Sequence, residues 1–310
     1  MRKRVAVIGA GFVGTMAAQR IAERNLADVV LADIVEGLPQ GKALDIRQAG
    51  TLEGMDVSVT GTNDFSLVKG SDVVVFTAGF PRTPGMTREE LALKNGGIVR
   101  SVVRDVARYA PGTMILMVTN PLDVMTHLAW KVSGFPPSRV FGMGGVLDSA
   151  RYRLFLSEAV GISARDIEAL VLGSHGDTMV PVDGYTTVKG VPILNFIGRE
   201  KLDAVIERTR NGGAEIVRLL RTGSAWHAPS ASVVAMVEAV LRDSGRMFPV
   251  SAYVEGQYGI RGIHIGVPVK LGAGGVETVY EIPLAEGELA ALRCSADVVQ
   301  KTFEGIWNEG

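Results

Sequence analysis

Short apolar runs alternate with longer amphipathic segments through the first half of the chain. Runs of four or five apolar residues predict strands buried on both faces at residues 5–8, 29–32, 73–76 and 114–118, and a further strand is predicted at 57–59. Helical patterns run from the glycines at 9–14 through Glu23, over 41–49 and over 89–109. Strands and helices that alternate at this spacing predict a parallel, doubly wound sheet.

The pattern changes from about Gly145 onward. Helices are predicted over 147–160, 203–220, 230–242 and 286–307, and strands over 169–172, 247–254, 263–271 and 277–282. No internal repeat, low-complexity tract or linker rich in Gly, Pro or Ser separates the two halves. We therefore expect an α/β chain with a doubly wound domain at 1–145 and an α+β domain at 146–310, packed as one compact unit.

Charge and composition exclude several classes of function. Lysine and arginine number 32 against 33 acidic residues, a net charge of -1, so the chain lacks the basic surface of a nucleic-acid-binding protein. The basic residues at 2–4 and the apolar stretch to Ala18 resemble a signal peptide, but three glycines and a strand pattern favour the first strand of the fold. No other segment approaches the ~18 apolar residues of a membrane helix, so we expect a soluble protein.

The single cysteine, Cys294, excludes an internal disulfide and fits a reducing cytoplasm. No histidine or acidic cluster lies beside it in the sequence, so we expect a small buried residue rather than a nucleophile.

A glycine-rich turn follows the first strand. It consists of Gly9, Ala10, Gly11, Phe12, Val13 and Gly14, and Asp33 ends the second strand 19 residues after Gly14. Gly9 permits the tight turn, Gly11 lets the backbone approach a pyrophosphate, and Gly14 lets the helix pack on the strand. Unpaired N–H groups at the start of the helix bind the diphosphate. The motif predicts a Rossmann NAD site, and Asp33 favours NAD over NADP because its carboxylate accepts hydrogen bonds from the ribose and repels a 2′-phosphate.

A loop punctuated by proline and glycine, residues 79–88, follows the strand at 73–76. It carries Arg82 and Arg88, and its prolines exclude regular helix. Loops at the carboxyl ends of parallel strands bind ligands in open α/β sheets. Two guanidinium groups there favour an anion, best a dicarboxylate, and closure of the loop would bring them to it. Exposed loop arginines are common, so the pair alone does not decide the matter.

Three polar positions in the second half suggest proton transfer and anion binding. Asp148 and Arg151 lie three residues apart on one face of the helix at 147–160, a spacing that an ordinary surface ion pair also shows. His175 lies between glycines just after the strand at 169–172, and histidine suits proton transfer near neutral pH. In the first half, the sequence leaves open whether the bond between Asn120 and Pro121 is cis or trans; a cis bond would hold the Asn120 side chain at a strand end.

Two other kinds of chemistry are disfavoured. Ser174 and His175 are adjacent in an extended segment, so their side chains point to opposite faces and cannot form a nucleophile–base pair. His127, His175, His227 and His264 have no metal-ligand spacing and no cysteine partner, so no metal site is predicted. We expect the other three histidines to be structural or surface residues.

Together these motifs resemble the lactate/malate dehydrogenase family, and specifically the lactate-dehydrogenase-like malate dehydrogenases. The resemblance covers essentially the whole chain. It rests, in this order, on the glycine turn at 9–14, the loop at 79–88, Val118-Thr119-Asn120-Pro121, and the segments 147–151 and 173–177. It implies reversible, NAD-dependent oxidation of (S)-malate to oxaloacetate by hydride transfer.

The resemblance also implies a role for each site residue. His175 is the proton donor and acceptor, oriented by Asp148, and Arg151 grips the carboxylate next to the reacting carbon. Arg88 polarises the carbonyl, and Asn120 hydrogen-bonds the substrate near the nicotinamide. The residues that contact the cofactor are Asn95, Val118, Thr119 and Asn120, besides the glycine turn and Asp33.

Two positions distinguish malate from lactate enzymes. Arg82 matches the position where lactate enzymes typically carry Gln, and it pairs with the second carboxylate of oxaloacetate. Ala225 matches a position where lactate enzymes place Thr, and its small side chain leaves room for the longer dicarboxylate. The resemblance further implies a homotetramer or dimer that acts in the cytoplasm, in the tricarboxylic acid cycle.

Three alternatives stand beside this interpretation. A dehydrogenase for lactate or another 2-hydroxy acid is disfavoured by Arg82 and Ala225. An NAD-dependent glycosidase shares such a cofactor domain but needs a metal, for which the sequence offers no ligand set. A non-catalytic NAD-binding module would tolerate the loss of His175, Asp148 or Arg151, and all three are present.

Overall fold

Six parallel strands form one part of a nine-stranded sheet in the computed structural model, which describes residues 2–81 and 86–308. The strand order across the sheet is β14-β13-β12-β6-β5-β4-β1-β2-β3. The parallel strands are β1 (Arg4–Ile8), β2 (Asp28–Ala32), β3 (Val59–Thr62), β4 (Val73–Phe76), β5 (Met114–Met117) and β6 (Val140–Gly142). The predicted doubly wound, Rossmann-type sheet is thereby confirmed.

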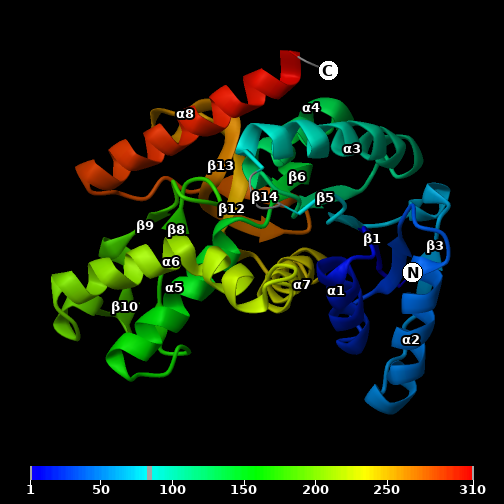
Figure 1. Ribbon diagram of the computed structural model, residues 1–310, viewed down its shortest axis with the longest axis horizontal. Helices are drawn as coiled ribbons and strands as arrows, with labels where there is room; N and C mark the ends of the chain where they lie inside the picture. The colour runs from blue at the N-terminus through cyan, green and yellow to red at the C-terminus, as the bar shows by residue number, and fades with distance from the viewer. Residues whose placement is uncertain (1, 82–85, 309–310) are drawn as a thin grey trace.

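Helices of the first half cover both faces of the parallel strands. They are α1 (Phe12–Glu23), α2 (Leu38–Glu53), α3 (Arg88–Tyr109) and α4 (Leu122–Ser133). Figure 1 shows α1 and α2 on one side of the sheet and α3 and α4 on the other. Because both faces are covered, the central strands are apolar throughout: all of β4 is buried, and only Arg4 of β1 is partly exposed.

The chain reverses its progress across the sheet between β1 and β4. β1 pairs with β2 on one side, where Val5 is opposite Val29, and with β4 on the other, where Val5 is opposite Val73. β2 and β3 extend the sheet in one direction, and β4, β5 and β6 extend it in the other. The carboxyl ends of β1 and β4 therefore mark the switch point at which open α/β sheets bind ligands.

The second half continues the same sheet. The antiparallel strands β12 (Arg246–Glu255), β13 (Arg261–Gly272) and β14 (Gly275–Val279) join it through the pairing of Ser251 with Gly142 of β6. Smaller sheets contain β7 (Ile167–Glu168), β8 (Val171–Leu172), β9 (Val180–Pro181), β10 (Thr187–Val188) and β11 (Val191–Pro192). The helices are α5 (Gly145–Val160), α6 (Arg199–Leu220), α7 (His227–Leu241) and α8 (Glu286–Asn308).

Short 3-10 helices lie between these elements, at Phe65–Val68, Pro137–Arg139, Asp183–Tyr185, Ile193–Asn195 and Gln257–Gly259. One hydrophobic core runs through both halves, from Val5 in β1 to Ile306 in α8. A smaller cluster around Tyr152 and Leu156 fills the space between α5, α6 and the short strands. The two halves thus pack as one compact unit, as predicted from the lack of a linker.

Two predicted strands are displaced. The third strand was expected at 57–59 but forms at Val59–Thr62. It lies at the edge of the sheet and its sequence is partly polar, so hydropathy marks it poorly. The close packing of β3 against α2 requires glycine at position 61, because a Cβ atom there would lie 2.1 Å from the carbonyl oxygen of Pro39 in α2. Of the strand expected at 169–172, only Val171 and Leu172 form a strand, β8, and β7 at 167–168 precedes the predicted range. The amide of Val182 donates to the carbonyl oxygen of Leu170, which extends the pairing of β8 with β9 by one residue.

Two buried histidines form a polar contact inside the core. His264 Nε2 lies 3.2 Å from the carbonyl oxygen of Val140, and its Nδ1 lies 3.1 Å from Nδ1 of His127. Burial, aided by nearby Lys131, lowers the pKa of His127 to about 3, and burial also lowers the pKa of His264 well below its ordinary value. Both rings are therefore neutral at pH 7, which confirms their predicted structural role; His227 is exposed at the start of α7.

Candidate active site

The glycine turn between β1 and α1 lies at the switch point of the sheet. Gly9 has a φ of +100°, and a Cβ atom there would lie 2.7 Å from the amide nitrogen of Ala78. A Cβ atom on Gly14 would lie 1.9 Å from the carbonyl oxygen of Gly9. A Cβ atom on Gly11 would meet nothing within 4 Å. Gly9 and Gly14 are therefore required by the packing of the turn itself, whereas the space in front of Gly11 is open to a ligand.

Asp33, at the end of β2, lies directly beside this turn. Its Oδ2 accepts a hydrogen bond from the amide of Ala10 at 2.6 Å, and its Oδ1 accepts one from the amide of Val35 at 2.9 Å. Gly11 is the N-cap of α1, and no side chain caps the helix. The free N–H groups at the start of α1 fit a diphosphate, and the half-buried carboxylate beside them fits the ribose of a dinucleotide.

Asn95 of α3 joins two loops on the opposite side of the turn. The side chain is buried; its Oδ1 accepts from the Phe80 amide at 2.8 Å, and its Nδ2 donates to the carbonyl oxygen of Asn120 at 2.7 Å. Thr119 Oγ1 donates to the carbonyl oxygen of Ala78 at 2.8 Å. Asn95, for which the sequence predicts a cofactor contact, thus holds together the loops that follow β4 and β5. The Asn120–Pro121 bond, whose isomer the sequence left open, is cis. Asn120 is exposed just past the end of β5, next to half-buried Val118 and buried Thr119.

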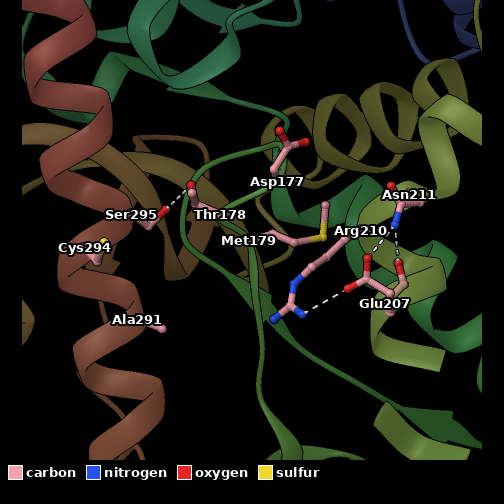
Figure 2. A pocket seen from close by; sticks show the side chains of 9 residues that line it. All are labelled: Asp177, Thr178, Met179, Glu207, Arg210, Asn211, Ala291, Cys294 and Ser295. Carbon is pink, nitrogen blue, oxygen red and sulfur yellow. Dashed lines mark hydrogen bonds and ion pairs between the residues drawn. The ribbon is translucent and has the colours of Figure 1, made fainter. Parts of the chain in front are cut away.

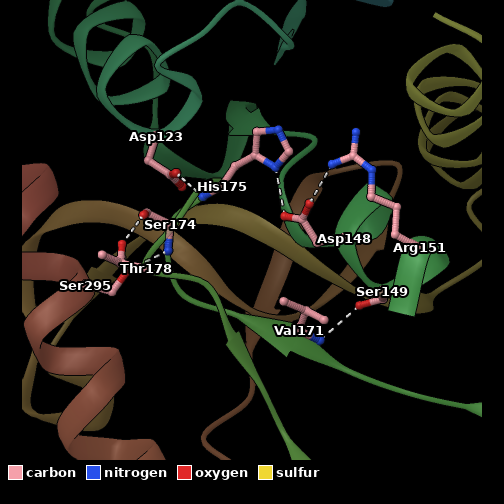
Figure 3. Close-up of polar contacts among 9 residues, drawn as sticks. All are labelled: Asp123, Asp148, Ser149, Arg151, Val171, Ser174, His175, Thr178 and Ser295. Carbon is pink, nitrogen blue, oxygen red and sulfur yellow. Dashed lines mark hydrogen bonds and ion pairs between the residues drawn. The ribbon is translucent and has the colours of Figure 1, made fainter. Parts of the chain in front are cut away.

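The Asp148 carboxylate joins His175 to Arg151 (Figure 3). Oδ2 of Asp148 lies 2.8 Å from His175 Nδ1, and Oδ1 accepts a hydrogen bond from Arg151 Nη1 at 3.3 Å. Asp148 is only 1% exposed, so the predicted helix-face pair is a buried cluster and not an ordinary surface ion pair. Burial opposes the protonation of His175, but Asp148 outweighs it, so the pKa of His175 is raised above its ordinary value.

A contact between α5 and β8 brings these residues together. Ser149 Oγ accepts a hydrogen bond from the amide of Val171 at 2.9 Å, which holds β8 against α5. His175 follows Val171 by four residues and therefore reaches Asp148, the neighbour of Ser149 (Figure 3).

Arg151 retains unused hydrogen-bonding capacity. Its Nε is buried without a partner among the described residues, and Nη1 bonds only one oxygen of Asp148. Gly212 and Gly213 of α6 make room for it, since a Cβ atom on Gly213 would lie 3.6 Å from Nη2. Burial lowers the pKa of the guanidinium, and Asp148 counteracts this. The group remains a cation with a planar set of donors that suits a carboxylate ligand.

The turn that carries His175 is anchored from two sides. The His175 amide donates to Asp123 Oδ2 of α4 at 2.7 Å, and the Ser174 amide donates to Ser295 Oγ of α8 at 2.8 Å. Ser295 also lies 3.0 Å from Thr178 Oγ1 (Figure 3). The sequence analysis missed these anchors. The sequence offers one sign of the role of Asp123, because an acidic residue at the apolar start of a buried helix is unusual. Nothing in the sequence distinguishes Ser295.

A stack of two aromatic rings links the glycine turn to the segment that precedes α7. The Phe12 and Trp226 rings are 5.0 Å apart at an interplanar angle of 27°. Ala225, half-buried, directly precedes Trp226. The predicted specificity residue thus belongs to a segment that contacts the predicted cofactor turn, and the sequence analysis did not identify Trp226 as the contact.

The two loop arginines are not placed. Arg82 lies outside the described residues, as does the side chain of Arg88. The backbone of Arg88 begins α3, within one residue of the predicted start. Thr87 caps this helix: its hydroxyl accepts from the amide of Glu90 at 3.1 Å, and the Glu90 carboxylate accepts from the amide of Thr87 at 2.8 Å.

A cavity of about 430 Å³ lies between α6 and α8, behind the turn that carries His175 (Figure 2). Thr178, Ser295 and Cys294 are among its lining residues, but His175, Asp148 and Arg151 are not. Cys294 is exposed, so the prediction of a buried cysteine was wrong. On amphipathic α8 the neighbouring Leu292 and Ser295 point into the protein, which turns Cys294 outward.

Within the described part of the chain, no group of three His, Cys, Asp or Glu side chains is arranged to hold a metal ion. The same residues contain no helix that combines the length and the hydropathy needed to cross a membrane.

Known proteins are similar to this chain over its whole length. The model of the NAD binding domain of lactate/malate dehydrogenase matches residues 3–142, and that of the family's alpha/beta C-terminal domain matches residues 145–309. A curated malate dehydrogenase of Roseiflexus sp. (strain RS-1) is 54% identical over 306 residues, which cover 99% of each protein.

Two solved structures are similar throughout. The crystal structure of Cryptosporidium parvum malate dehydrogenase matches with a TM-score of 0.97 and 40% identity, over 99% of this chain and 100% of that one. The lactate dehydrogenase of the same organism, in complex with lactic acid and NAD, matches with a TM-score of 0.96 and 42% identity, over 99% of each chain.

The glycine turn allows a matched test of packing. Gly14→Ala should lower the free energy of unfolding by about 2–3 kcal/mol, because its Cβ would overlap the carbonyl oxygen of Gly9. Gly11→Ala, whose Cβ meets nothing, should change it by less than about 1 kcal/mol. Urea titrations of both variants measure the difference. Equal stability of the two variants would contradict the close approach of α1 to β1.

Proposed function

The chain belongs to the lactate/malate dehydrogenase family, and on that premise we propose that it catalyses the reversible, NAD-dependent oxidation of (S)-malate to oxaloacetate. The observation that carries this proposal is the buried His175–Asp148–Arg151 cluster. It combines a proton acceptor, a carboxylate that stabilises the charged imidazole, and a cation with free donors. An oxidoreductase for a hydroxy acid needs all three.

The first half of the chain provides the residues that would hold NAD. The turn at 9–14 and the start of α1 would bind the diphosphate, Asp33 would bind the adenosine ribose, and Asn95 and the segment at 118–120 would contact the cofactor. The uncapped helix start and the open space at Gly11 support this assignment. When bound, NAD supplies the hydride acceptor for malate oxidation.

His175 moves the proton. Nδ1 is held by Asp148, so it carries hydrogen and Nε2 is left to face the substrate. In malate oxidation, neutral His175 takes the hydroxyl proton at Nε2, and Asp148 stabilises the resulting imidazolium. In oxaloacetate reduction, His175 must begin protonated. Oxidation therefore requires a pH above the pKa of His175 and reduction a pH below it, and Asp148 raises that pKa.

Arg82 and Ala225 account for the choice of substrate, whereas Arg88, Arg151 and Asn120 act on groups that malate and lactate share. Arg151 binds the carboxylate next to the reacting carbon, Arg88 polarises the carbonyl, and Asn120 hydrogen-bonds the substrate. Arg82 pairs with the second carboxylate, for which Ala225 leaves room. Fold alone cannot make this choice, since a malate and a lactate dehydrogenase match this chain almost equally well.

We further propose a homotetramer or a dimer that acts in the cytoplasm, in the tricarboxylic acid cycle. Sedimentation equilibrium measures the assembly directly, and a monomer at micromolar concentration would contradict it. A single cysteine is consistent with a reducing compartment.

His175→Asn should abolish turnover and leave NADH binding nearly intact, because the imidazole acts on the substrate proton and the cofactor is held mainly by the first half of the chain. Loss of a general acid–base typically costs at least about 10²–10⁴-fold. Steady-state kinetics and NADH fluorescence titration separate the two effects. Asp148→Asn should impair turnover less completely, because the imidazole remains but loses control of its tautomer. More than a tenth of wild-type activity in His175→Asn would show that another group moves the proton.

NAD(H) should be preferred over NADP(H) by roughly a hundredfold or more in kcat/KM, because Asp33 would lie close to the added phosphate. Asp33→Ser removes the repulsion and should narrow this gap, measured with NADH and NADPH at saturating oxaloacetate. A comparable kcat/KM of the wild-type enzyme with both cofactors would contradict the proposal that Asp33 binds the ribose and repels the 2′-phosphate.

Arg82→Gln is the experiment that tests the choice of malate over lactate. Charge-assisted hydrogen bonds contribute roughly 1.5–3 kcal/mol each. Two such bonds to the second carboxylate should therefore raise kcat/KM for oxaloacetate over that for pyruvate by about two to four orders of magnitude. The variant should lose efficiency on oxaloacetate and gain it on pyruvate, with little change in NADH affinity. Arg88→Gln is the matched control and should depress turnover on both substrates. An unchanged ratio of kcat/KM for oxaloacetate to kcat/KM for pyruvate in Arg82→Gln would show that Arg82 does not determine the choice of substrate.

A further inference from the structure

Asp123 is a second buried carboxylate beside His175, and the mechanism above does not use it. It lies in the first turn of α4 and is 3% exposed. Its Oδ2 accepts the hydrogen bond from the His175 amide at 2.7 Å, and its Oδ1 has no hydrogen-bond partner within the described residues (Figure 3). The contact spans the two halves of the chain, because α4 belongs to the first half and His175 to the second.

A hydrogen bond to an amide does not by itself require a carboxylate. Asparagine has an acceptor oxygen of the same reach and would not place a charge in the protein interior, where an unpaired ion is costly. Anchoring of the His175 amide therefore does not explain why this position carries a charged carboxylate with one unbonded oxygen. Its position in the first turn of α4 favours the ionised form, because the helix N-terminus carries partial positive charge.

The charges around His175 indicate what the carboxylate does. Asp148 and Arg151 on α5 carry opposite charges and contact each other, so they balance. Among the described residues no Lys or Arg forms an ion pair with Asp123, and the positive charge that stabilises its carboxylate is that of His175. With a neutral imidazole the four side chains carry one negative charge, and with an imidazolium they carry none.

We propose that Asp123 is a positioning residue of the catalytic turn that also keeps the proton on His175. It holds the backbone of His175 in place across the two halves of the chain, and the negative charge of its buried carboxylate stabilises the imidazolium. The catalytic part of this inference rests on the proposed function. The electrostatic part rests on the position of the Asp123 carboxylate at the His175 amide, which does not depend on the substrate.

The titration of the cluster is consistent with this role. Burial raises the pKa of Asp123 to about 6, against the lowering effects of the nearby Ser251 hydroxyl of β12, the His175 amide and the His175 charge; Asp148 adds to the rise. On His175, burial opposes the proton most strongly and Arg151 adds to that opposition, whereas Asp148 favours the proton and Asp123 adds a smaller favourable contribution. Asp123 is therefore mainly ionised at and above neutral pH, where oxaloacetate reduction needs the proton on His175 most.

Asp123→Asn tests the charge while keeping an acceptor for the His175 amide. The pKa of His175 should fall by on the order of one pH unit. In kcat/KM, the decline of oxaloacetate reduction at high pH and the rise of malate oxidation should both move to lower pH by that amount. Reduction at a pH above both pKa values should fall by about tenfold, which is the same shift expressed as a rate. Labelled-histidine NMR on the full-length enzyme reads the His175 pKa without turnover.

Asp123→Ala is the comparison that separates charge from anchoring. It removes the acceptor as well, so kcat should fall in both directions at every pH, in addition to the shift of the profile. Ser295→Ala removes an uncharged anchor from the neighbouring amide and should lower kcat without moving the profile. NADH affinity and the melting temperature show that each variant is folded.

The proposal is overturned if Asp123→Asn titrates and turns over with the wild-type pH profile, because Asp123 would then be an anchor only. If that variant does not fold, Ser251→Ala provides the second test. Loss of the hydroxyl favours protonated Asp123, so the profile should move in the same direction by a smaller amount, and no movement would refute the proposal. A wild-type enzyme inactive on oxaloacetate would refute the proposed function instead, and the NMR comparison would still decide the role of Asp123.

Discussion

The candidate site depends on one buried carboxylate that serves two partners. Asp148 is almost wholly removed from water and divides its two oxygens between His175 and Arg151. Without it, an imidazole that must become a cation would lie beside a guanidinium with no anion between them. A buried charge is tolerated only when it is paired and hydrogen-bonded, so each member of the cluster requires the others. The orientation of the imidazole, the retention of the guanidinium and the raised affinity of His175 for protons all follow from this arrangement.

The arrangement is held by elements from distant parts of the chain. α5 presents Asp148 and Arg151, Ser149 of the same helix holds β8, and β8 leads directly into the turn that carries His175. Asp123 of α4 and Ser295 of α8 bind two consecutive amides of that turn. The continuous sheet allows this convergence, because β12 joins β6 and leaves no flexible junction between the two halves. A proton-transfer group placed by packed helices is more closely defined than one on a free loop.

The scaffold and the substrate preference are separable. A malate dehydrogenase and a lactate dehydrogenase match the chain with TM-scores of 0.97 and 0.96, so backbone geometry is common to both activities. The groups shared by the two reactions act on the carboxylate and the hydroxyl that malate and lactate both contain. The preference must therefore come from side chains that reach the distal end of the substrate, for which Arg82 and Ala225 are the proposed residues.

The sequence by itself determined the sheet, the glycine turn and the identity of the chemical groups. Short-range physics decides these features: a strand buried on both faces must be apolar, and a Cβ atom on Gly14 would overlap the Gly9 carbonyl. The prediction from sequence misplaced the edge strand β3, because the hydropathy pattern of that strand is weak. The same prediction buried Cys294, whereas α8 turns this residue outward. Only the tertiary structure decided which polar groups meet. Asp123 and Ser295 are 52 and 121 residues from their partners, and such contacts depend on how helices pack rather than on local pattern.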